Sequence, residues 1–467
     1  MKILTLGIDY TTGEPLLDAQ SEIGFADVIL RSLFTGGDSA QISKGIKRGE
    51  TQRPSTTDLG DVRKAGWAYL INSSDPNRDE IIRIIQPLAI RRGMKSPEKP
   101  LIFAEQSPDK WCDWVLNNLT PFGFDEPPYY LLIVGSPQQV PFRFQSFLSS
   151  TFAVGRLDFN ALDDLAAYIE KILVLEDSAQ PLVNRQAVFL APDGGKGDAT
   201  FFSRRYMAEP LAHLVENALG VPVARLFGEN ATRSRVQDTL HTSSPALVYA
   251  ASHGLGALKQ PLEFQKQFNG AIICQQEESG QALQDRLFSA GDIIIEKPFL
   301  DGCVFFQFAC FGYGTPSLSD FSHWRDGVIP SRNASTDFVA AFPKRMLAHL
   351  HGPIAFIGHV DMAWLYGFAE PGEVDLFEWW NPRLKPFAQA LEGLLSTQPV
   401  GLALHEMNKR YNNLNAYLTN LFDSIHLLES RNDEELMKKI AYSYVVRNDA
   451  QNFMIFGDPA ARLRLPL

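Results

Sequence analysis

The stretch VFFQFACFGYGT, residues 304–315, is apolar apart from one glutamine until it reaches Cys310, after which two glycines follow within four positions. It is rich in aromatic side chains and lacks the alternation of apolar and polar residues. This pattern is typical of a strand that is buried on both faces of a sheet. We therefore predict a central strand that ends at a thiol.

Four further runs have the same character and stop at a glycine, aspartate or histidine. They are YYLLIVG (129–135), QAVFLAPD (186–193), ALVYAASHG (246–254) and GPIAFIGH (352–359). Amphipathic segments at 159–176 and 201–220 lie between them, and residues 400–440 also have a helical pattern. Strands that alternate with helices predict an α/β fold with a mostly parallel central sheet and crossover helices.

The polar stretch EDSAQPLVNRQ (176–186) is the best candidate for a domain junction. It predicts a smaller N-terminal α/β unit over residues 1–180, followed by a second unit over residues 181–467 with a helical C-terminal part. A single domain remains an open alternative.

Composition restricts the class of protein. Hydrophobic residues make up 45% of the chain and charged residues 21%, as in ordinary globular proteins. Lys and Arg number 43 against 54 for Asp and Glu, a net charge of -11 without a dense basic cluster, so we expect no nucleic-acid partner. We also expect no membrane span, since no apolar run approaches roughly 20 residues, and a cytoplasmic location, since no secretory signal is evident.

The four cysteines have no C-x-x-C spacing, so we expect reduced thiols and no metal site.

Two of the predicted strands carry chemically useful residues at their carboxyl ends, where ligands collect in open parallel sheets. Cys310 ends one strand and His253 another. If these strands are neighbours, their backbones lie about 5 Å apart and both side chains reach a common point. A thiolate could then attack a carbonyl carbon while the imidazole manages the proton, with the amides of Gly254 and Cys310 facing the oxyanion.

Other assignments of these residues stay open on the pattern alone. A cysteine or histidine at the end of an apolar run is more often a core residue than a catalytic one. His359 also ends a predicted strand and is followed by Asp361, so a pair of Cys310 and His359 is chemically conceivable.

The blocks YAASHG (249–254) and FFQFACFGYGT (305–315) resemble the two catalytic blocks of caspase-fold (clan CD) cysteine peptidases, in particular the gingipain and CHAT branch. Flanking segments extend the resemblance to about residues 129–467. They are LLIVGSPQQVPF (131–142), AVGRLDFNALDDLAAYIEKILVLE (153–176), GPIAFIGHVDMAW (352–364) and NFMIFGDPAARLRL (452–465). The resemblance implies a caspase-like three-layer sandwich in which Cys310 is the nucleophile, His253 the general acid and base, and Gly254 and Cys310 the oxyanion donors.

The resemblance also implies a substrate pocket lined by Phe308 and Trp364. Relatives that cut after Arg or Lys place an aspartate at the base of this pocket, because a buried cation needs a charge partner. Asp193 and Asp361 are the candidates for that aspartate, with Asp198 and Asp320 behind them. We expect a preference for a basic residue before the cleaved bond, the P1 residue.

These observations predict a cysteine endopeptidase that cleaves protein substrates through a thioester, without a cofactor or metal ion. Bacterial relatives of this kind often act as effectors that an upstream protease or a signalling partner switches on, and the polar span 255–300 is a candidate for that control. A catalytically inactive caspase-like scaffold and an acyl transferase that uses the same thiol are the alternatives.

Overall fold

The computed structural model describes residues 2–3, 6–16, 20–21, 58–104, 107–119, 127–178, 183–321, 332–368, 382–427 and 434–466. Ten strands form one large sheet in the order β5-β4-β6-β7-β18-β17-β14-β10-β8-β9. All neighbours in it are parallel except β17 and β18. The strands are β4 (Trp67–Asn72), β5 (Leu101–Phe103), β6 (Tyr130–Val134), β7 (Ala153–Leu157), β8 (Asn184–Ala191), β9 (Val223–Phe227), β10 (Pro245–Ala251), β14 (Val304–Phe308), β17 (Ala355–His359) and β18 (Phe453–Phe456).

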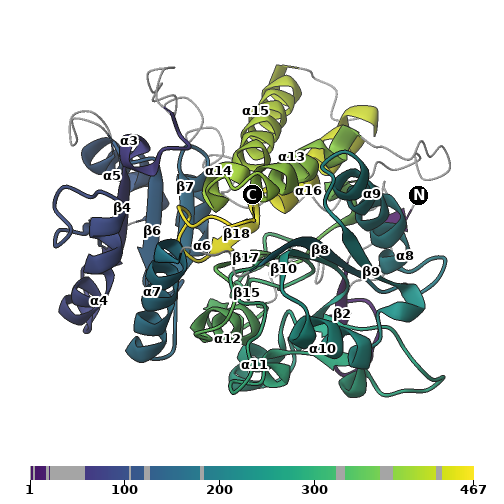
Figure 1. Ribbon diagram of the computed structural model, residues 1–467. Helices are drawn as coiled ribbons and strands as arrows, with labels where there is room; N and C mark the ends of the chain where they lie inside the picture. Colours follow the sequence, from purple (N-terminus) through teal and green to yellow (C-terminus); the bar gives the residue numbers. More distant parts are fainter. Residues whose placement is uncertain are drawn as a thin grey trace.

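Helices cover both faces of this sheet, so the molecule has three layers (Figure 1). One layer contains α9 (Glu209–Asn217), α13 (Lys385–Leu395), α14 (Val400–Ala403), α15 (His405–Leu427) and α16 (Glu434–Gln451). The opposite layer contains α4 (Arg78–Arg91), α7 (Leu162–Asp177) and α12 (Ala341–Ala348). Shorter helices are α3 (Val62–Ala65), α5 (Trp111–Asn118), α6 (Phe142–Ser149), α8 (Ala199–Ser203), α10 (Arg233–Thr242) and α11 (Leu262–Phe268). The predicted α/β fold with a mostly parallel central sheet is confirmed.

Three small sheets accompany the large one. The four-stranded sheet β13-β12-β11-β2 combines β2 (Gly7–Asp9), β11 (Gly254–Gly256), β12 (Ile272–Ile273) and β13 (Leu287–Phe288). Two-stranded sheets pair β1 (Lys2–Ile3) with β3 (Gln20–Ser21) and β15 (Gly314–Thr315) with β16 (Phe338–Val339). The four-stranded sheet joins the N-terminal part of the chain to the residues that follow β10.

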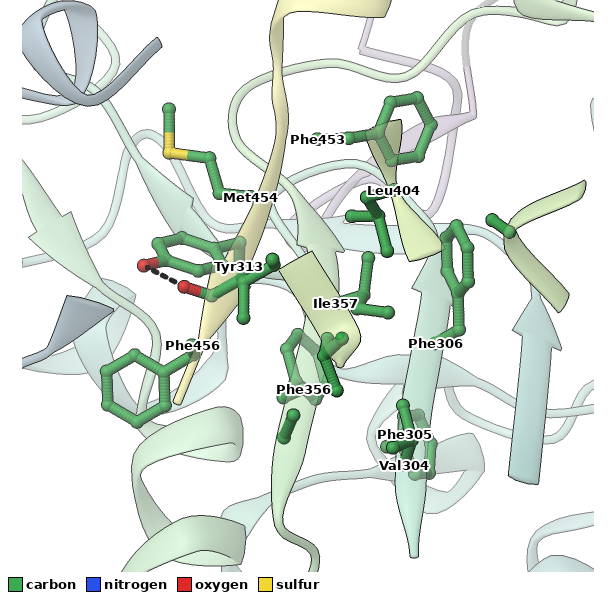
Figure 2. Packing of buried hydrophobic residues seen from close by; sticks show 14 of the residues in the cluster. Val304, Phe305, Phe306, Tyr313, Phe356, Ile357, Leu404, Phe453, Met454 and Phe456 are labelled. Carbon is green, nitrogen blue, oxygen red and sulfur yellow. Dashed lines mark hydrogen bonds between the residues drawn. The ribbon is translucent and has the colours of Figure 1, made fainter. Parts of the chain in front are cut away.

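All five strands predicted from apolar runs are present, as β6, β8, β10, β14 and β17. Aromatic side chains hold the central strands together. Phe305 of β14 stacks on Phe356 of β17 with 5.6 Å between ring centroids, and Phe306 meets Phe453 of β18 at 6.1 Å (Figure 2). The tight packing of these large rings fixes the relative position of β14, β17 and β18.

The strands before and after residue 180 belong to the same sheet. The connection is made by β18, from the end of the chain, which lies between β7 and β17. A buried ion pair strengthens it, since Arg92 donates to Asp458 at 2.7 Å. The division into units 1–180 and 181–467 stays a prediction.

Two polar segments contain more regular structure than their composition suggests. Residues 78–91 form helix α4, although the segment includes Pro87. The span 255–300 contains α11 and the strands β12 and β13. Apolar residues at Ile81, Ile85 and Leu88 explain α4, because they recur at helical spacing and are buried against the sheet.

Candidate active site

The strands β10 and β14 are parallel neighbours, and Ala251 pairs with Phe308 in their register. His253 and Cys310 each lie two residues beyond this pair, so they leave the sheet at the same level on adjacent strands. The Ser252 N–H donates to the Phe308 carbonyl at 3.2 Å, which extends the pairing towards the two residues. The structure therefore brings together the histidine and the cysteine that the sequence singles out.

Gly254 fits tightly against the backbone of Cys310. A Cβ atom built on this glycine would lie 1.9 Å from the Cys310 carbonyl oxygen and 2.8 Å from its amide nitrogen. Any larger residue would force the two segments apart. The glycine that follows His253 is thus required by the approach of the two chain segments.

Both ring nitrogens of His253 face oxygen atoms. The Nδ1 atom lies 2.6 Å from the carbonyl oxygen of Leu6, and the Nε2 atom lies 3.0 Å from each carboxylate oxygen of Asp198. A carbonyl and an ionised carboxylate can only accept hydrogen bonds. The ring completes both contacts when each of its nitrogens carries a proton.

Asp198 is held in place independently of the histidine. It is the N-cap of α8, where its side chain accepts from the Thr200 N–H at 2.7 Å and also from the Thr200 hydroxyl. Burial acts to raise the pKa of Asp198, but the hydrogen bond and charge of His253, together with Thr200, lower it to about 2. The carboxylate is therefore a fixed anion next to the imidazole.

The sequence predicted Asp198 only as a secondary candidate for the substrate pocket. Its contact with His253 was missed because 55 positions separate the two residues. The local signal of a helix N-cap was available in the segment GDAT, where an aspartate precedes the start of α8. That signal fixes the position of the carboxylate but does not reveal what lies opposite it.

The Cys310 side chain is fully buried. Its sulfur accepts a hydrogen bond from the Ala363 N–H at 3.1 Å. The next residue, Phe311, has a left-handed backbone with φ of 58°, and its N–H donates to the Asp361 carbonyl at 2.7 Å. The chain that follows β17 thus holds the turn that carries the thiol, and this turn stores backbone strain.

Asp361 and Trp364 lie within two residues of Ala363, whose N–H donates to the Cys310 sulfur. The Asp361 carboxylate is buried and accepts from the Ser319 hydroxyl at 2.7 Å and from the Asp320 N–H at 2.9 Å. Burial raises the pKa of this carboxyl to about 6, and the charge of Asp320 contributes in the same direction. Trp364 packs its ring against Phe321 at 5.1 Å. Both predicted pocket residues are distant from Cys310 in the sequence, and the hydrogen bond from Ala363 to the sulfur brings their segment to the thiol. The Asp361 carboxylate anchors the segment after the thiol.

The other two predicted pocket residues lie in different surroundings. Asp193 forms an ion pair with Arg204 at 2.9 Å and accepts from the Gly195 N–H at 2.8 Å. Phe308 is fully buried, and its ring contacts those of Phe368, Phe387 and Phe453. Its side chain is part of the aromatic core beneath the sheet end.

His359, the competing partner for Cys310, ends β17 on the other side of β14. Its ring is fully buried and lies 5.0 Å from that of Phe453. The Nε2 atom is 3.1 Å from the Asp449 carbonyl oxygen and 3.3 Å from its carboxylate. These contacts tie His359 to α16 and into the core.

No group of three His, Cys, Asp or Glu side chains within the described ranges is arranged to hold a metal ion. No helix formed by the described part of the chain is both long enough and apolar enough to cross a bilayer.

Comparisons with known proteins gave structural neighbours but no sequence family. No family model matches the chain, and no curated protein matches it. Among solved structures, the complex of the pro- and mature domains of RgpB from Porphyromonas gingivalis has a TM-score of 0.42 at 11% identity, covering 85% of this chain and 80% of that one. A protein described as a protease has a TM-score of 0.47 at 10% identity, covering 85% of this chain and 78% of the other. We draw no functional conclusion from either likeness.

Proposed function

We propose that this chain is a cysteine endopeptidase in which Cys310 is the nucleophile and His253 the general acid and base. The observation that carries the proposal is the register of β10 and β14, which sets the two residues at the same level on adjacent strands. A nucleophile and a proton donor placed in this way can act on one peptide group.

The proposed reaction follows from these positions. Cys310 transfers its proton to Nδ1 of His253 as the sulfur attacks the carbonyl carbon of the substrate, so that a C–S bond forms and the carbonyl double bond becomes a single bond to an oxyanion. The Gly254 and Cys310 N–H groups stabilise the resulting oxyanion. His253 donates a proton to the departing amine as the C–N bond breaks, and water then hydrolyses the thioester, releasing the acid and restoring the thiol.

Asp198 acts in this proposal as a positioning residue. Its carboxylate meets the Nε2 atom of His253, so the imidazole presents Nδ1 to the peptide group. The fixed N-cap geometry limits rotation of the carboxylate and hence of the ring.

We propose a cytoplasmic effector that acts on protein or peptide substrates and that an upstream protease or a signalling partner activates. The span 255–300 is a candidate for that control because β11, which follows His253, begins it. The basic P1 preference stays a prediction, and the contacts of Asp193 and Asp361 weigh against it because both carboxylates are already engaged.

One observation favours a second candidate, a catalytically inactive scaffold with the same fold. The Cys310 side chain is fully buried, and a substrate cannot reach a thiol that stays covered. An acyl transferase that uses the same thiol is the third possibility, and it differs from a peptidase in its acceptor.

A peptide library separates these candidates. We expect any cleavage by the wild-type chain to be lost in Cys310→Ala and to continue at the wild-type rate in Cys303→Ala. Cys303 is a buried thiol immediately before β14. Cleavage that survives in Cys310→Ala would reject the proposal. Transfer of the acyl group to an added amine without net hydrolysis would favour the acyl transferase.

A further inference from the structure

The N-terminal segment of residues 6–16 reaches the candidate active site although it is about 250 positions away in the sequence. Its strand β2 pairs in parallel with β11, matching Gly7 with Gly254 and Ile8 with Leu255. The chain then turns back, since the Leu16 N–H donates to the Gly7 carbonyl at 2.8 Å. The segment is thus a small hairpin added to the edge of the sheet that continues from His253 (Figure 1).

The peptide unit between Leu6 and Gly7 lies at the centre of the site. The Leu6 carbonyl oxygen is 2.6 Å from His253 Nδ1 and accepts from the Gly254 N–H at 3.3 Å. The Leu6 N–H donates to the Ala363 carbonyl at 3.2 Å. A Cβ atom built on Gly7 would lie 3.3 Å from the Cys310 sulfur.

These contacts match those that a peptide substrate needs here. A carbonyl oxygen meets a predicted oxyanion donor and the imidazole, the thiol lies beside the same peptide unit, and the preceding N–H is bound by the chain after β17. The residues that follow the unit add a strand to a sheet edge, a common mode of peptide recognition. The segment therefore occupies the position of an extended peptide in the proposed reaction.

We propose that residues 6–16 fill the substrate groove of this protein from within, with Leu6 in the P1 subsite, and thereby shield Cys310 from other peptides until the segment is displaced. This inference rests on the proposed peptidase function. It also names the substrate class: a peptide with an apolar P1 residue followed by a small residue such as glycine.

Burial and charge support an apolar P1 subsite. Leu6 is fully buried and belongs to the main hydrophobic cluster. A cation in that position would need a desolvated partner. Arg204 already pairs with Asp193, and the Ser319 hydroxyl and Asp320 N–H are bound to Asp361. The predicted candidates for a cation partner are therefore committed to contacts of their own.

The close fit around Gly7 gives a way to open the site. A Cβ atom on this glycine would meet Leu16 Cδ1 at 2.5 Å as well as the Cys310 sulfur. Gly7→Val should therefore displace the hairpin, and it leaves His253, Gly254 and Cys310 unsubstituted. Glu14→Val is the matched control, because it places the same side chain at an exposed position of the hairpin whose backbone carbonyl binds the Asp9 N–H.

The test is the rate at which iodoacetamide alkylates Cys310, resolved by peptide mass spectrometry. We expect the rate in Gly7→Val to exceed that of the wild type by about tenfold or more, since the rate follows the fraction of molecules in which the thiol is open. Glu14→Val should react at the wild-type rate. The buried thiols of Cys274 and Cys303 report unfolding, and they should stay unreactive in every variant.

A synthetic peptide with the sequence of residues 6–16 provides a second measurement that needs no folded variant of the hairpin. Added to Gly7→Val, it should restore protection of Cys310, and the same peptide with valine in place of glycine should not. Equal alkylation of the wild type and Gly7→Val, with no protection by the peptide, would overturn the inference.

Leu6 variants test the subsite assignment separately. We expect Leu6→Arg to speed alkylation of Cys310 as Gly7→Val does, because the segment would have to bury an unpaired cation, whereas Leu6→Met should stay protected. A subsite that prefers a basic residue would give the opposite result, with Leu6→Arg protected more strongly than the wild type.

These readouts do not depend on catalysis, so the two proposals can fail separately. If the thiol is unmasked as expected but no peptide is ever cleaved, the peptidase function fails and the occupied groove stands. If the wild type cleaves peptides at the rate of Gly7→Val and its thiol is equally reactive, the occupied groove fails and the function stands.

Discussion

Two histidines flank the strand that ends at Cys310, and they differ in what surrounds them. His253 follows β10 and His359 ends β17, the two parallel neighbours of β14. The sequence signal is almost the same for both, an apolar strand that stops at a histidine. Either residue could be paired with the thiol on that signal alone.

Their partners separate the two roles. The ring of His253 lies between a fixed carboxylate and the carbonyl of another chain segment, both acceptors at the open end of the sheet. His359 is bound to Asp449 of α16 and lies against the ring of Phe453. The residues that contact each histidine, more than its position at a strand end, distinguish the proposed catalytic histidine from the one in the core.

The largest expected effect is the loss of activity in His253→Ala. General acid and base catalysis contributes about 10²-fold to 10⁴-fold to a rate, so peptide cleavage should fall by that factor. The free energy of unfolding should fall as well, because the buried ring bridges the Asp198 carboxylate and the Leu6 carbonyl. Cleavage kinetics measured beside a urea unfolding curve check both statements.

His359→Ala should lower stability without removing the activity. Removing the buried ring leaves a cavity and deprives Asp449 of a hydrogen-bond partner, so the free energy of unfolding should fall by roughly 2–4 kcal/mol. Cleavage by the molecules that remain folded should persist. A stable His359→Ala protein without activity would mean that His359, and not His253, is the catalytic histidine.

The pH dependence of the free energy of unfolding tests the role of Asp361, which follows β17. Burial raises its pKa from 3.8 to about 6, so its contribution to stability is complete below about pH 3.8 and is lost as the pH rises through 6. The wild type should lose up to roughly 3 kcal/mol of unfolding free energy across this window relative to Asp361→Asn. Denaturant unfolding at a series of pH values measures it, and equal slopes in both proteins would contradict this account.

Asp198→Asn tests the β10 side with the smallest expected effect. An amide keeps the N-cap of α8 but removes the charge next to His253, so cleavage should fall by about tenfold to a hundredfold, equivalent to roughly 1.4–2.7 kcal/mol of transition-state stabilisation. A fall in kcat with an unchanged KM would indicate a role in chemistry. Loss of thermal stability alone would reduce Asp198 to a helix cap.

The sequence predicts the local parts of this structure better than the distant ones. Strands β10 and β14 are recognisable because each is a continuous apolar run that ends at a reactive residue. Helix α4 was missed because polar residues dilute its apolar positions, and β4 was not singled out although its six residues are all buried. Local patterns dominate where burial is uniform along a run.

The site itself depends on contacts between remote residues. His253 meets Leu6 across 247 positions and Asp198 across 55, and neither spacing leaves a periodic trace in the sequence. The role of Gly254 as a close-contact residue likewise became evident only when the Cys310 backbone was placed against it. Sequence reasoning therefore found the two residues of the proposed dyad but not the residues that contact them.

A peptide acyloxymethyl ketone with leucine at P1 tests the central claim most directly, because it alkylates a thiol only where an imidazole assists. Applied to the Gly7→Val protein and located by mass spectrometry, the label should lie on Cys310. It should be lost when His253 is also changed to alanine and be retained when His359 is changed instead. A label that persists without His253, or that lies on another cysteine, would contradict the assignment of Cys310 and His253 to one active site.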